Sequence, residues 1–373
     1  MNAARFERPR LAVVKIGSSS LRAGDGRLDR ERVHDLADQL VRAREAGTQV
    51  VLVSSGAVAA GLGLLGFATR PRDLVSLQAA ASVGQGELIH EYQVSLLARG
   101  VTCAQILLTQ DDFLRRTRYL NARSTLRRLL ELGALPVVNE NDVVATEELS
   151  YGDNDHLAAL VASMLEAQVL VLLSDVEGLF DADPRRGDAT LVSRVDDVET
   201  VDPASLGGAG SFGTGGMRSK VEAARVATAS DCHTVVASAA HPDVVAAALD
   251  GAPVGTWFVA RTRRLEARRL WIGYALTPHG RVHIDAGAAR AVAGGRTSLL
   301  AVGVTGVDGA FSAGDAIEIV GPDGAPVARG LSAYDAPDLQ RIAGRTTSDA
   351  VATFGSAFGR EVVHRDDLVP LHA

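Results

Sequence analysis

The sequence lacks several features that define whole classes of protein. Only two cysteines occur in 373 residues, Cys103 and Cys232, each within an apolar stretch. Two isolated cysteines predict small buried side chains in a reducing compartment rather than a disulfide framework. No apolar run approaches the length that spans a bilayer, and the arginines of the first ten residues are not followed by the apolar h-region of a signal peptide. We therefore expect a soluble protein of the cytoplasm.

Lysine is scarce although basic residues are not. Of the 38 basic residues, 36 are arginines, and the two lysines are Lys15 and Lys220. Chance survival of two lysines is one explanation. The alternative is that both positions require a compact, flexible ammonium and cannot accept a planar guanidinium. The second explanation gains support because both lysines lie in segments that are typical of phosphate binding.

Charge and size narrow the range of functions further. The net charge of −7 and the pI near 5.7 argue against a protein that mainly grips a nucleic-acid backbone. A content of 47% hydrophobic and 22% charged residues is ordinary for a globular protein. The length allows one large domain and one smaller domain, each with its own core.

Residues 10–260 alternate between short apolar runs and longer amphipathic stretches, which predicts an α/β domain. The predicted buried strands are Leu11–Ile16, Gln49–Val53, Thr102–Leu108, Leu135–Val138, Val169–Leu173 and Thr234–Ala237. The predicted helices include Arg30–Ala46, Asn121–Leu132 and Asp155–Glu166. Such alternation predicts a three-layer sandwich, with a mainly parallel central sheet covered by helices on both faces. Ligands of these sheets collect at the carboxyl ends of the strands.

The pattern changes after residue 260. Five arginines crowd around Glu266, which favours a solvated linker over residues 261–275 rather than a basic docking patch. Residues 276–373 show almost no helical periodicity, and short runs are separated by Gly, Pro and Asp, so we expect a small β-rich domain. Its predicted strands are Arg281–Ile284, Leu299–Val304, Ala316–Val320 and Val327–Leu331.

Two glycine-containing segments have the character of phosphate-binding loops. Lys15 closes the first strand, and Gly17 and three serines follow it, so that successive amides can form an anion-binding turn. A second segment, residues 208–220, is glycine-rich and ends at Lys220 in front of a helix, although its spacing is not that of a Walker A loop. Taken singly, each segment is explained equally well as a plain connection or a surface loop.

Polar residues also gather where four predicted strands or helices meet loops. The segments are Ser54–Ala57, Asn139–Asp142, Gly152–Asp155 and Ser174–Asp175. Asn, Asp and Ser are common in turns and helix caps, which would explain some of them without a ligand. Their position at predicted carboxyl ends of strands favours ligand binding.

Five segments, in this order, resemble the glutamate 5-kinases of the amino acid kinase superfamily. They are Val13–Ser19, Val53–Ala57, Val138–Val143, Gly152–Leu157 and Gly213–Lys220. The C-terminal stretches Arg341–Gly344 and Val363–Asp367 resemble the PUA domain that bacterial members often carry. Where some relatives have threonine, this chain has Ser54 and Ser174.

The resemblance implies the first step of proline biosynthesis, in which ATP and L-glutamate give ADP and L-glutamyl 5-phosphate. It implies that Lys15 and Lys220 stabilise the transferred phosphoryl group and that Asp155 holds the two lysines. It implies glutamate binding by Ser55, Asp142 and Asn154. The residues implied for the nucleotide are Lys15, Gly17, Ser174, Asp175, Thr214, Gly215, Gly216, Met217, Arg218, Ser219 and Lys220.

The resemblance also implies partners. ATP would come with Mg²⁺ on its phosphates, without a metal site of the protein itself. Feedback inhibition by proline, assembly into a homo-oligomer and transfer of the product to glutamyl phosphate reductase are expected on the same ground.

Alternative functions stay open at this stage. Kinases for acetylglutamate, aspartate, carbamate or UMP share the superfamily, and a non-catalytic metabolite sensor is a further alternative. An RNA-associated protein is another, because PUA-like domains elsewhere bind RNA. From residue 276 onward, however, 11 acidic residues face eight arginines, which is the wrong sign for a phosphate-binding surface.

Overall fold

The computed structural model divides into two compact units, residues 1–264 and 265–373, which are described separately. It describes residues 7–24, 26–67, 69–144, 154–182, 187, 189–202, 216–261, 272–273, 276, 278–295 and 297–371. Most of the predicted linker 261–275 lies outside these residues. Within the described part, no helix has both the length and the apolar character that crossing a bilayer requires.

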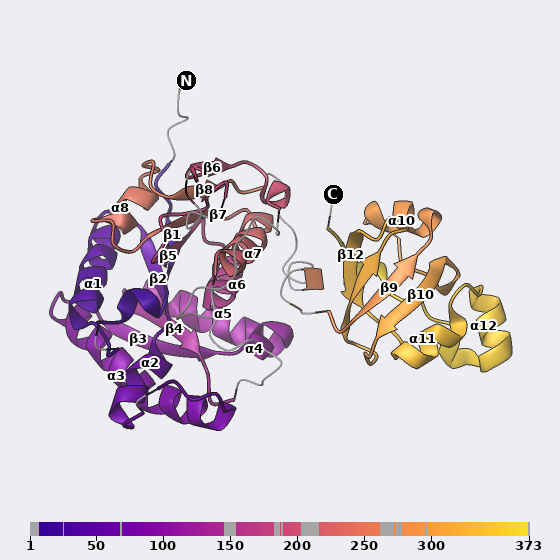
Figure 1. Ribbon diagram of the computed structural model, residues 1–373, viewed down its shortest axis with the longest axis horizontal. Coiled ribbons are helices and arrows are strands. Elements are labelled where there is room, and N and C mark those ends of the chain that lie inside the picture. The colour runs from indigo at the N-terminus through magenta and orange to yellow at the C-terminus, as the bar shows by residue number, and fades with distance from the viewer. Residues whose placement is uncertain are drawn as a thin grey trace, which may run out of the picture. The chain divides into compact units, whose positions relative to one another are not determined.

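The first unit is built on an eight-stranded sheet with the order β3-β4-β2-β1-β5-β7-β8-β6 (Figure 1). The six strands from β3 to β7 in this order run parallel, and β8 is antiparallel to β7. The strands are β1 (Leu11–Ile16), β2 (Gln49–Ser54), β3 (Cys103–Leu108), β4 (Leu135–Glu140), β5 (Val169–Ser174), β6 (Arg194–Val195), β7 (His233–Ser238) and β8 (Thr256–Phe258). The parallel part therefore presents the carboxyl ends of six strands at one edge.

Helices cover both faces of this sheet, which gives the expected three layers (Figure 1). One face carries α1 (Arg30–Glu45), α2 (Ala57–Leu64), α3 (Leu74–Leu97) and α8 (Val244–Leu249). The other carries α5 (Arg116–Glu131), α6 (Asn154–Leu165) and α7 (Met217–Ala229), and the short α4 (Gln110–Leu114) precedes α5. The predicted fold class is confirmed for this unit.

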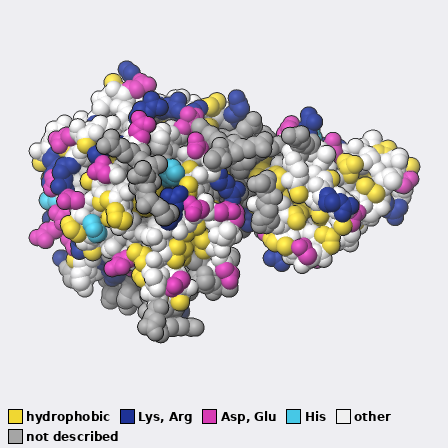
Figure 2. All heavy atoms as spheres, turned by 90° about the horizontal axis from the view of Figure 1, so that it is seen from above, with side chains coloured by type: hydrophobic (Ala, Val, Ile, Leu, Met, Phe, Trp, Pro, Cys, Tyr) yellow, Lys and Arg dark blue, Asp and Glu magenta, His cyan; other side chains and the backbone are white. Residues whose placement is uncertain are grey.

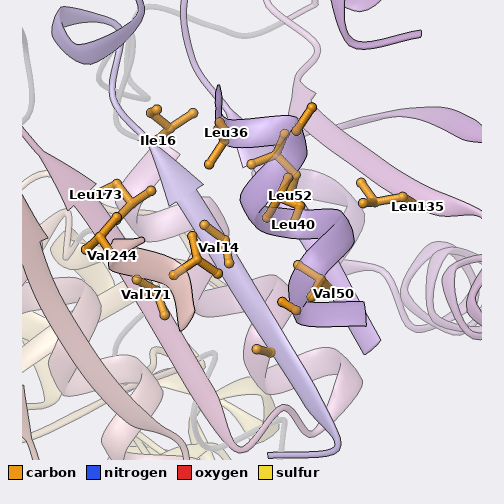
Figure 3. Close-up of a cluster of buried hydrophobic side chains, with 14 of the residues drawn as sticks. Val14, Ile16, Leu36, Leu40, Val50, Leu52, Leu135, Val171, Leu173 and Val244 are labelled. Atoms are coloured by element: carbon orange, nitrogen blue, oxygen red, sulfur yellow. The ribbon is translucent and has the colours of Figure 1, made fainter. Parts of the chain in front are cut away.

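Side-chain alternation along β1 separates the core from the site. Val14 and Ile16 point toward α1, where they join Leu36 and Leu40 in the buried cluster of Figure 3. Because successive residues of a strand face opposite sides, Lys15 points to the other face, which α6 covers. The strand thus places one charged side chain among apolar neighbours at its carboxyl end.

The α2–α3 pair was not predicted. The two helices cross so closely that a Cβ atom on Gly61 would lie 1.8 Å from the carbonyl oxygen of Ala80, and one on Gly84 would lie 1.9 Å from that of Ala57. Only glycine permits this approach of two backbones. Helix α2 begins two residues after Ser55, so the crossing fixes α3 beside the carboxyl end of β2.

The second unit contains a five-stranded sheet with the order β10-β9-β11-β12-β13. Its strands are β9 (Gly280–Ile284), β10 (Val304–Gly309), β11 (Ala316–Val320), β12 (Pro326–Leu331) and β13 (Leu368–Pro370). The unit also contains three helices, namely α10 (Ala286–Ala293), α11 (Ala336–Ile342) and α12 (Thr347–Phe354), of which α10 and α11 contact the sheet. Its own core includes Ile317, Leu339 and Val363.

Some element predictions for the second unit were wrong. A strand was expected over Leu299–Val304, but Leu299 forms only an isolated bridge, Ala301–Gly303 form a 3-10 turn, and β10 begins at Val304. The helices were missed because all three are of eight residues or fewer, too short for a clear helical period. In the first unit, α5 begins five residues before the predicted Asn121, and β3 is a half-exposed edge strand rather than a buried one.

Candidate functional site

Two lysines meet one carboxylate at the carboxyl edge of the large sheet. Lys15 Nζ lies 2.5 Å from Asp155 Oδ1, and Lys220 Nζ lies 3.1 Å from Asp155 Oδ2. Ser219 Oγ lies 2.9 Å from the same Oδ2 and donates a hydrogen bond to it. The two lysines are 4% exposed and Asp155 is fully buried. Lys15 and Lys220 are 205 positions apart in the chain, so only the fold brings them together.

Each member of this cluster is held by a different element. Lys15 comes from the end of β1, Asp155 from the first turn of α6, and Lys220 from the first turn of α7. The first turns of α6 and α7 also direct backbone amides toward the same edge, and helix N-termini favour anions. Two ammoniums and one carboxylate leave one net positive charge in a buried place, where an anionic ligand would be stabilised.

The electrostatics of the cluster keep Asp155 ionised. Burial by itself would raise the pKa of this carboxyl group, but the charges and hydrogen bonds of Lys15 and Lys220 outweigh burial and lower the pKa below its usual range. A permanently charged Asp155 is therefore available to hold both ammoniums across the range in which proteins normally work.

The arginines of this unit lie in different surroundings from the lysines. Figure 2 shows blue basic side chains on the surface beside magenta acidic ones, and these surface cations are arginines because both lysines are buried. Arg30 pairs with Glu87 at 2.8 Å, and Arg42 pairs with Asp243 at 2.7 Å, with both arginines more than half exposed. Surface arginine and buried lysine thus occupy separate environments, as the scarcity of lysine suggested.

Ser55 and Asn154 also lie together at the carboxyl edge, within hydrogen-bonding distance of each other. Asn154 Nδ2 lies 3.0 Å from Ser55 Oγ, 3.0 Å from the Ser54 carbonyl oxygen and 2.8 Å from Asn139 Oδ1. Both Ser55 and Asn154 are less than one-tenth exposed. The structure therefore brings these two predicted substrate residues into one polar network, next to Asp155.

Asp142 lies beyond β4, in the turn that follows Glu140. Burial raises the pKa of this carboxyl group to about 6, and the charge of Arg70 opposes the shift. Asp142 is thus half protonated near pH 6, which makes it sensitive to a cation that binds beside it.

The predicted nucleotide residues are described in part. Ser174 ends β5, and its Oγ donates to Asp175 Oδ1 at 3.1 Å. Gly17 follows β1, and a methyl group there would lie 3.7 Å from Lys15 Nζ, so glycine leaves space beside this ammonium. Gly216 is the N-cap of α7, and Met217 and Arg218 are its first two residues. Thr214 and Gly215 lie outside the described residues.

The predicted site residues follow the order of the strands along the sheet. Strands β4, β2, β1 and β5 are adjacent in that order, and they end near Asn139, Ser55, Lys15 and Ser174. Along the sheet, Ser55 and Asn139 thus lie on one side of Lys15, and Ser174 lies on the other. Within the described residues, no group of three His, Cys, Asp or Glu side chains is arranged to hold a metal ion.

Comparisons with known proteins assign this arrangement to a family. Residues 10–238 match the model of the amino acid kinase family, and residues 280–353 match the PUA domain. The glutamate 5-kinase of Salinispora arenicola is 52% identical over 98% of this chain and 99% of its own length. This chain belongs to the glutamate 5-kinase family.

Two further glutamate 5-kinases are similar over nearly the whole chain. The protein of Thermobifida fusca is 50% identical, with 99% of this chain and 95% of its own length covered. The protein of Streptomyces coelicolor is 51% identical, with 97% of both chains covered. The family resemblance carried by the five sequence motifs is confirmed, and so is the PUA-like character of the C-terminal unit.

Sequence reasoning overlooked part of the polar network of this glutamate 5-kinase family member. Asn139 was noted only as one of several polar residues, and Gln85 and Tyr92 of α3 were not singled out. Asn139 Nδ2 donates to Gln85 Oε1 at 2.6 Å, and the Tyr92 hydroxyl lies 3.0 Å from Ser54 Oγ. The sequence beside Gln85 offered only Gly84 and Gly86, and a glycine inside a helix indicates close packing at the glycine itself, so no signal pointed to Gln85.

Proposed function

We propose that this chain transfers the γ-phosphoryl group of ATP to the side-chain carboxylate of L-glutamate, giving ADP and L-glutamyl 5-phosphate. The observation that carries the proposal is the contact of both lysines with Asp155 at the carboxyl edge of the sheet. Membership of the glutamate 5-kinase family supports it. The reaction is the first step of proline biosynthesis.

The nucleophile of this reaction needs no general base. A glutamate side chain has a reference pKa of about 4.3, so it is already an anion near neutral pH. One carboxylate oxygen forms a bond to the γ-phosphorus, and the bond from this phosphorus to the β–γ bridging oxygen breaks. The electron pair of the broken bond leaves with ADP. The protein therefore has to position two anions and to stabilise their charge, and proton transfer is not required.

Lys15 and Lys220 supply the charge in this proposal. Asp155 holds the two ammoniums so that both can approach the oxygens of the transferred phosphoryl group, and Ser219 helps to hold Asp155. Preorganised cations in a buried site stabilise developing negative charge more strongly than water does. The amides at the start of α7 and the turn after β1 would contribute to phosphate binding.

The two substrates would lie side by side along the sheet edge. We assign glutamate to Ser55, Asn154 and Asp142. We assign the nucleotide to Gly17, Ser174, Asp175 and residues 214–220, of which residues 217–220 form the first turn of α7. Lys15 lies next to the last residue of β1, the strand between β2 and β5, and this position suits a group that contacts the phosphoryl group during its transfer. Asp142 would bind the α-ammonium of glutamate.

Magnesium is best treated as part of the nucleotide. Mg²⁺ commonly binds through substrate phosphates and waters with one or two carboxylates. Asp155 faces two ammoniums, which makes it a poor ligand for a further cation, so we assign no described residue to the ion. The proposed substrate is therefore MgATP.

The alternatives weighed from the sequence are less well supported. Kinases for acetylglutamate, aspartate, carbamate or UMP would share the large unit, but relatives near 50% identity over the whole chain are glutamate 5-kinases. Inhibition by proline, homo-oligomer formation and delivery of the product to glutamyl phosphate reductase remain proposals that rest on family resemblance. A cytoplasmic location and weak affinity for RNA likewise remain predictions.

The proposal is tested by trapping the product. Incubation with ATP, Mg²⁺, glutamate and hydroxylamine should give glutamyl hydroxamate in an amount that matches the ADP released. Acetylglutamate, aspartate, carbamate and UMP should release far less ADP under the same conditions. Absence of the hydroxamate, or faster ADP release with another acceptor, would contradict the proposed substrate.

A further inference from the structure

Three amide side chains and one hydroxyl form a continuous chain of hydrogen bonds from α3 to the proposed glutamate site. Asn139 Nδ2 donates to Gln85 Oε1 at 2.6 Å, Asn154 Nδ2 lies 2.8 Å from Asn139 Oδ1, and the same nitrogen lies 3.0 Å from Ser55 Oγ. Gln85 is half-buried, and the other three residues are buried. The chain reaches residues assigned to glutamate, although Gln85 itself belongs to none of the family motifs quoted above.

Backbone groups fix which way the two asparagine amides face. The backbone amide of Glu140 donates to Asn139 Oδ1 at 2.9 Å, so this oxygen must face it and Nδ2 must face Gln85. The Ser54 carbonyl can only accept, and it lies 3.0 Å from Asn154, so Nδ2 of Asn154 must face it. Asn139 Nδ2 points away from Asn154 and needs an acceptor, and Gln85 Oε1 provides it.

This orientation gives the proposed glutamate site a defined polarity. Asn154 Oδ1 is buried and has no hydrogen-bond partner among the described residues, so it presents an acceptor. Ser55 Oγ accepts from Asn154, which leaves the hydroxyl hydrogen available as a donor. An acceptor and a donor side by side match the ammonium and the carboxylate of an α-amino acid. The opposite amide orientation would place a donor where the ammonium has to bind.

We infer that Gln85 is a positioning residue that selects substrates carrying an α-ammonium group, acting through Asn139 on Asn154 and Ser55. The inference rests on the proposed function and adds a specificity determinant to it. Gln85 is held in place by the glycine contact of α3 with α2, and Tyr92 of the same helix bonds Ser54, the neighbour of Ser55. Helix α3 therefore supports the hydrogen-bonded network at both ends, at Asn139 through Gln85 and beside Ser55 through Tyr92.

Substitution of Gln85 tests the inference through specificity rather than through activity alone. Glutarate has the same reacting carboxylate as glutamate and lacks the α-ammonium. In Gln85→Leu, Asn139 Nδ2 loses its acceptor, and the Glu140 amide is left to hold this side chain against Asn154 without the contact to α3. A less firmly held Asn139 positions Asn154 less well, so we expect kcat/KM for glutamate to fall about tenfold while that for glutarate changes little. The ratio of the two values should therefore fall by about the same factor. Gln85→Glu keeps an acceptor for Asn139 and should retain most of the ratio.

Controls separate this effect from general damage. Gln93 lies on the same helix and is exposed, so Gln93→Leu should leave the ratio, the KM for ATP and the melting temperature unchanged. An equal loss toward glutamate and glutarate in Gln85→Leu, or a loss in Gln85→Glu as large as that in Gln85→Leu, would overturn the inference. Failure of the wild-type chain to form glutamyl hydroxamate would instead overturn the proposed function, so the two failures are distinguishable.

Discussion

At the scale of single residues, the chain uses arginine and lysine for different tasks. Arginines such as Arg42 lie at the surface in ion pairs, which contribute little to stability because water and salt screen them. Lys15 and Lys220 are buried against one carboxylate. Burying two ammoniums costs solvation free energy, so the arrangement is better explained by ligand binding than by stability.

Asp142 predicts a pH dependence of glutamate binding. The ionised carboxylate binds an ammonium, and its pKa is raised to about 6 by burial, so binding should be intact above this pH and be lost as the pH falls through it. One unit below the pKa, roughly one molecule in ten keeps the charge, so KM for glutamate should rise about tenfold between pH 7.5 and pH 5.

The control for this prediction is Asp142→Asn, which carries no titrating group at this position. Its KM for glutamate should be high and almost constant between pH 5 and pH 7.5, a range in which the glutamate side chain stays largely ionised. An equally steep rise of KM in Asp142→Asn would show that another group is responsible.

At the scale of elements, the close crossing of α2 and α3 connects stability with the site. We expect Gly84→Ala to lower the free energy of unfolding by about 2 kcal/mol, because the added methyl group would collide with the backbone of α2. Gly86→Ala is the matched control, since no atom lies within 4 Å of its added methyl group, and a gain of about 0.5–1 kcal/mol is expected from helix propensity. Denaturant unfolding of both variants would measure the difference, and equal effects would contradict the crossing.

Sequence patterns predicted elements well where burial sets a clear period. The central strands are near-continuous apolar runs because helices cover both faces, and β1 and β5 match their predicted bounds closely. Helices α2 and α3 were missed because their contact depends on Gly61 and Gly84, residues that ordinarily weaken a helix. Short helices such as α10 were not predicted. In a sequence interrupted by glycine, a helix of one or two turns has the same pattern as a short strand.

Some residues of the site were predicted from the sequence and others were not. Lys15, Ser55 and Asp155 lie within motifs, and their positions at strand or helix ends made their common edge predictable. Gln85 lies inside α3, 54 residues from Asn139, and no local pattern connects the two. Contacts of this kind depend on how helices cross, which the sequence periodicity does not encode.

At the scale of the whole molecule, the proposed chemistry belongs to one unit. All described site residues lie within residues 1–264, and this unit has its own buried core, as residues 265–373 do. We therefore expect a chain that ends at residue 264 to fold and to phosphorylate glutamate at a rate close to that of the full chain. Circular dichroism and the hydroxamate assay would check this, and a folded but inactive fragment would show that the C-terminal unit contributes to the site.

The exchange of lysine for arginine tests the central claim most directly. Lys15→Arg and Lys220→Arg keep the charge but replace a compact ammonium by a bulkier, planar guanidinium. We therefore expect kcat at saturating ATP and glutamate to fall on the order of 100-fold in each variant. The reverse exchange at the surface, Arg42→Lys, should leave kcat unchanged because this side chain is more than half exposed. Near-normal turnover of either lysine variant, with the fold intact, would contradict the account.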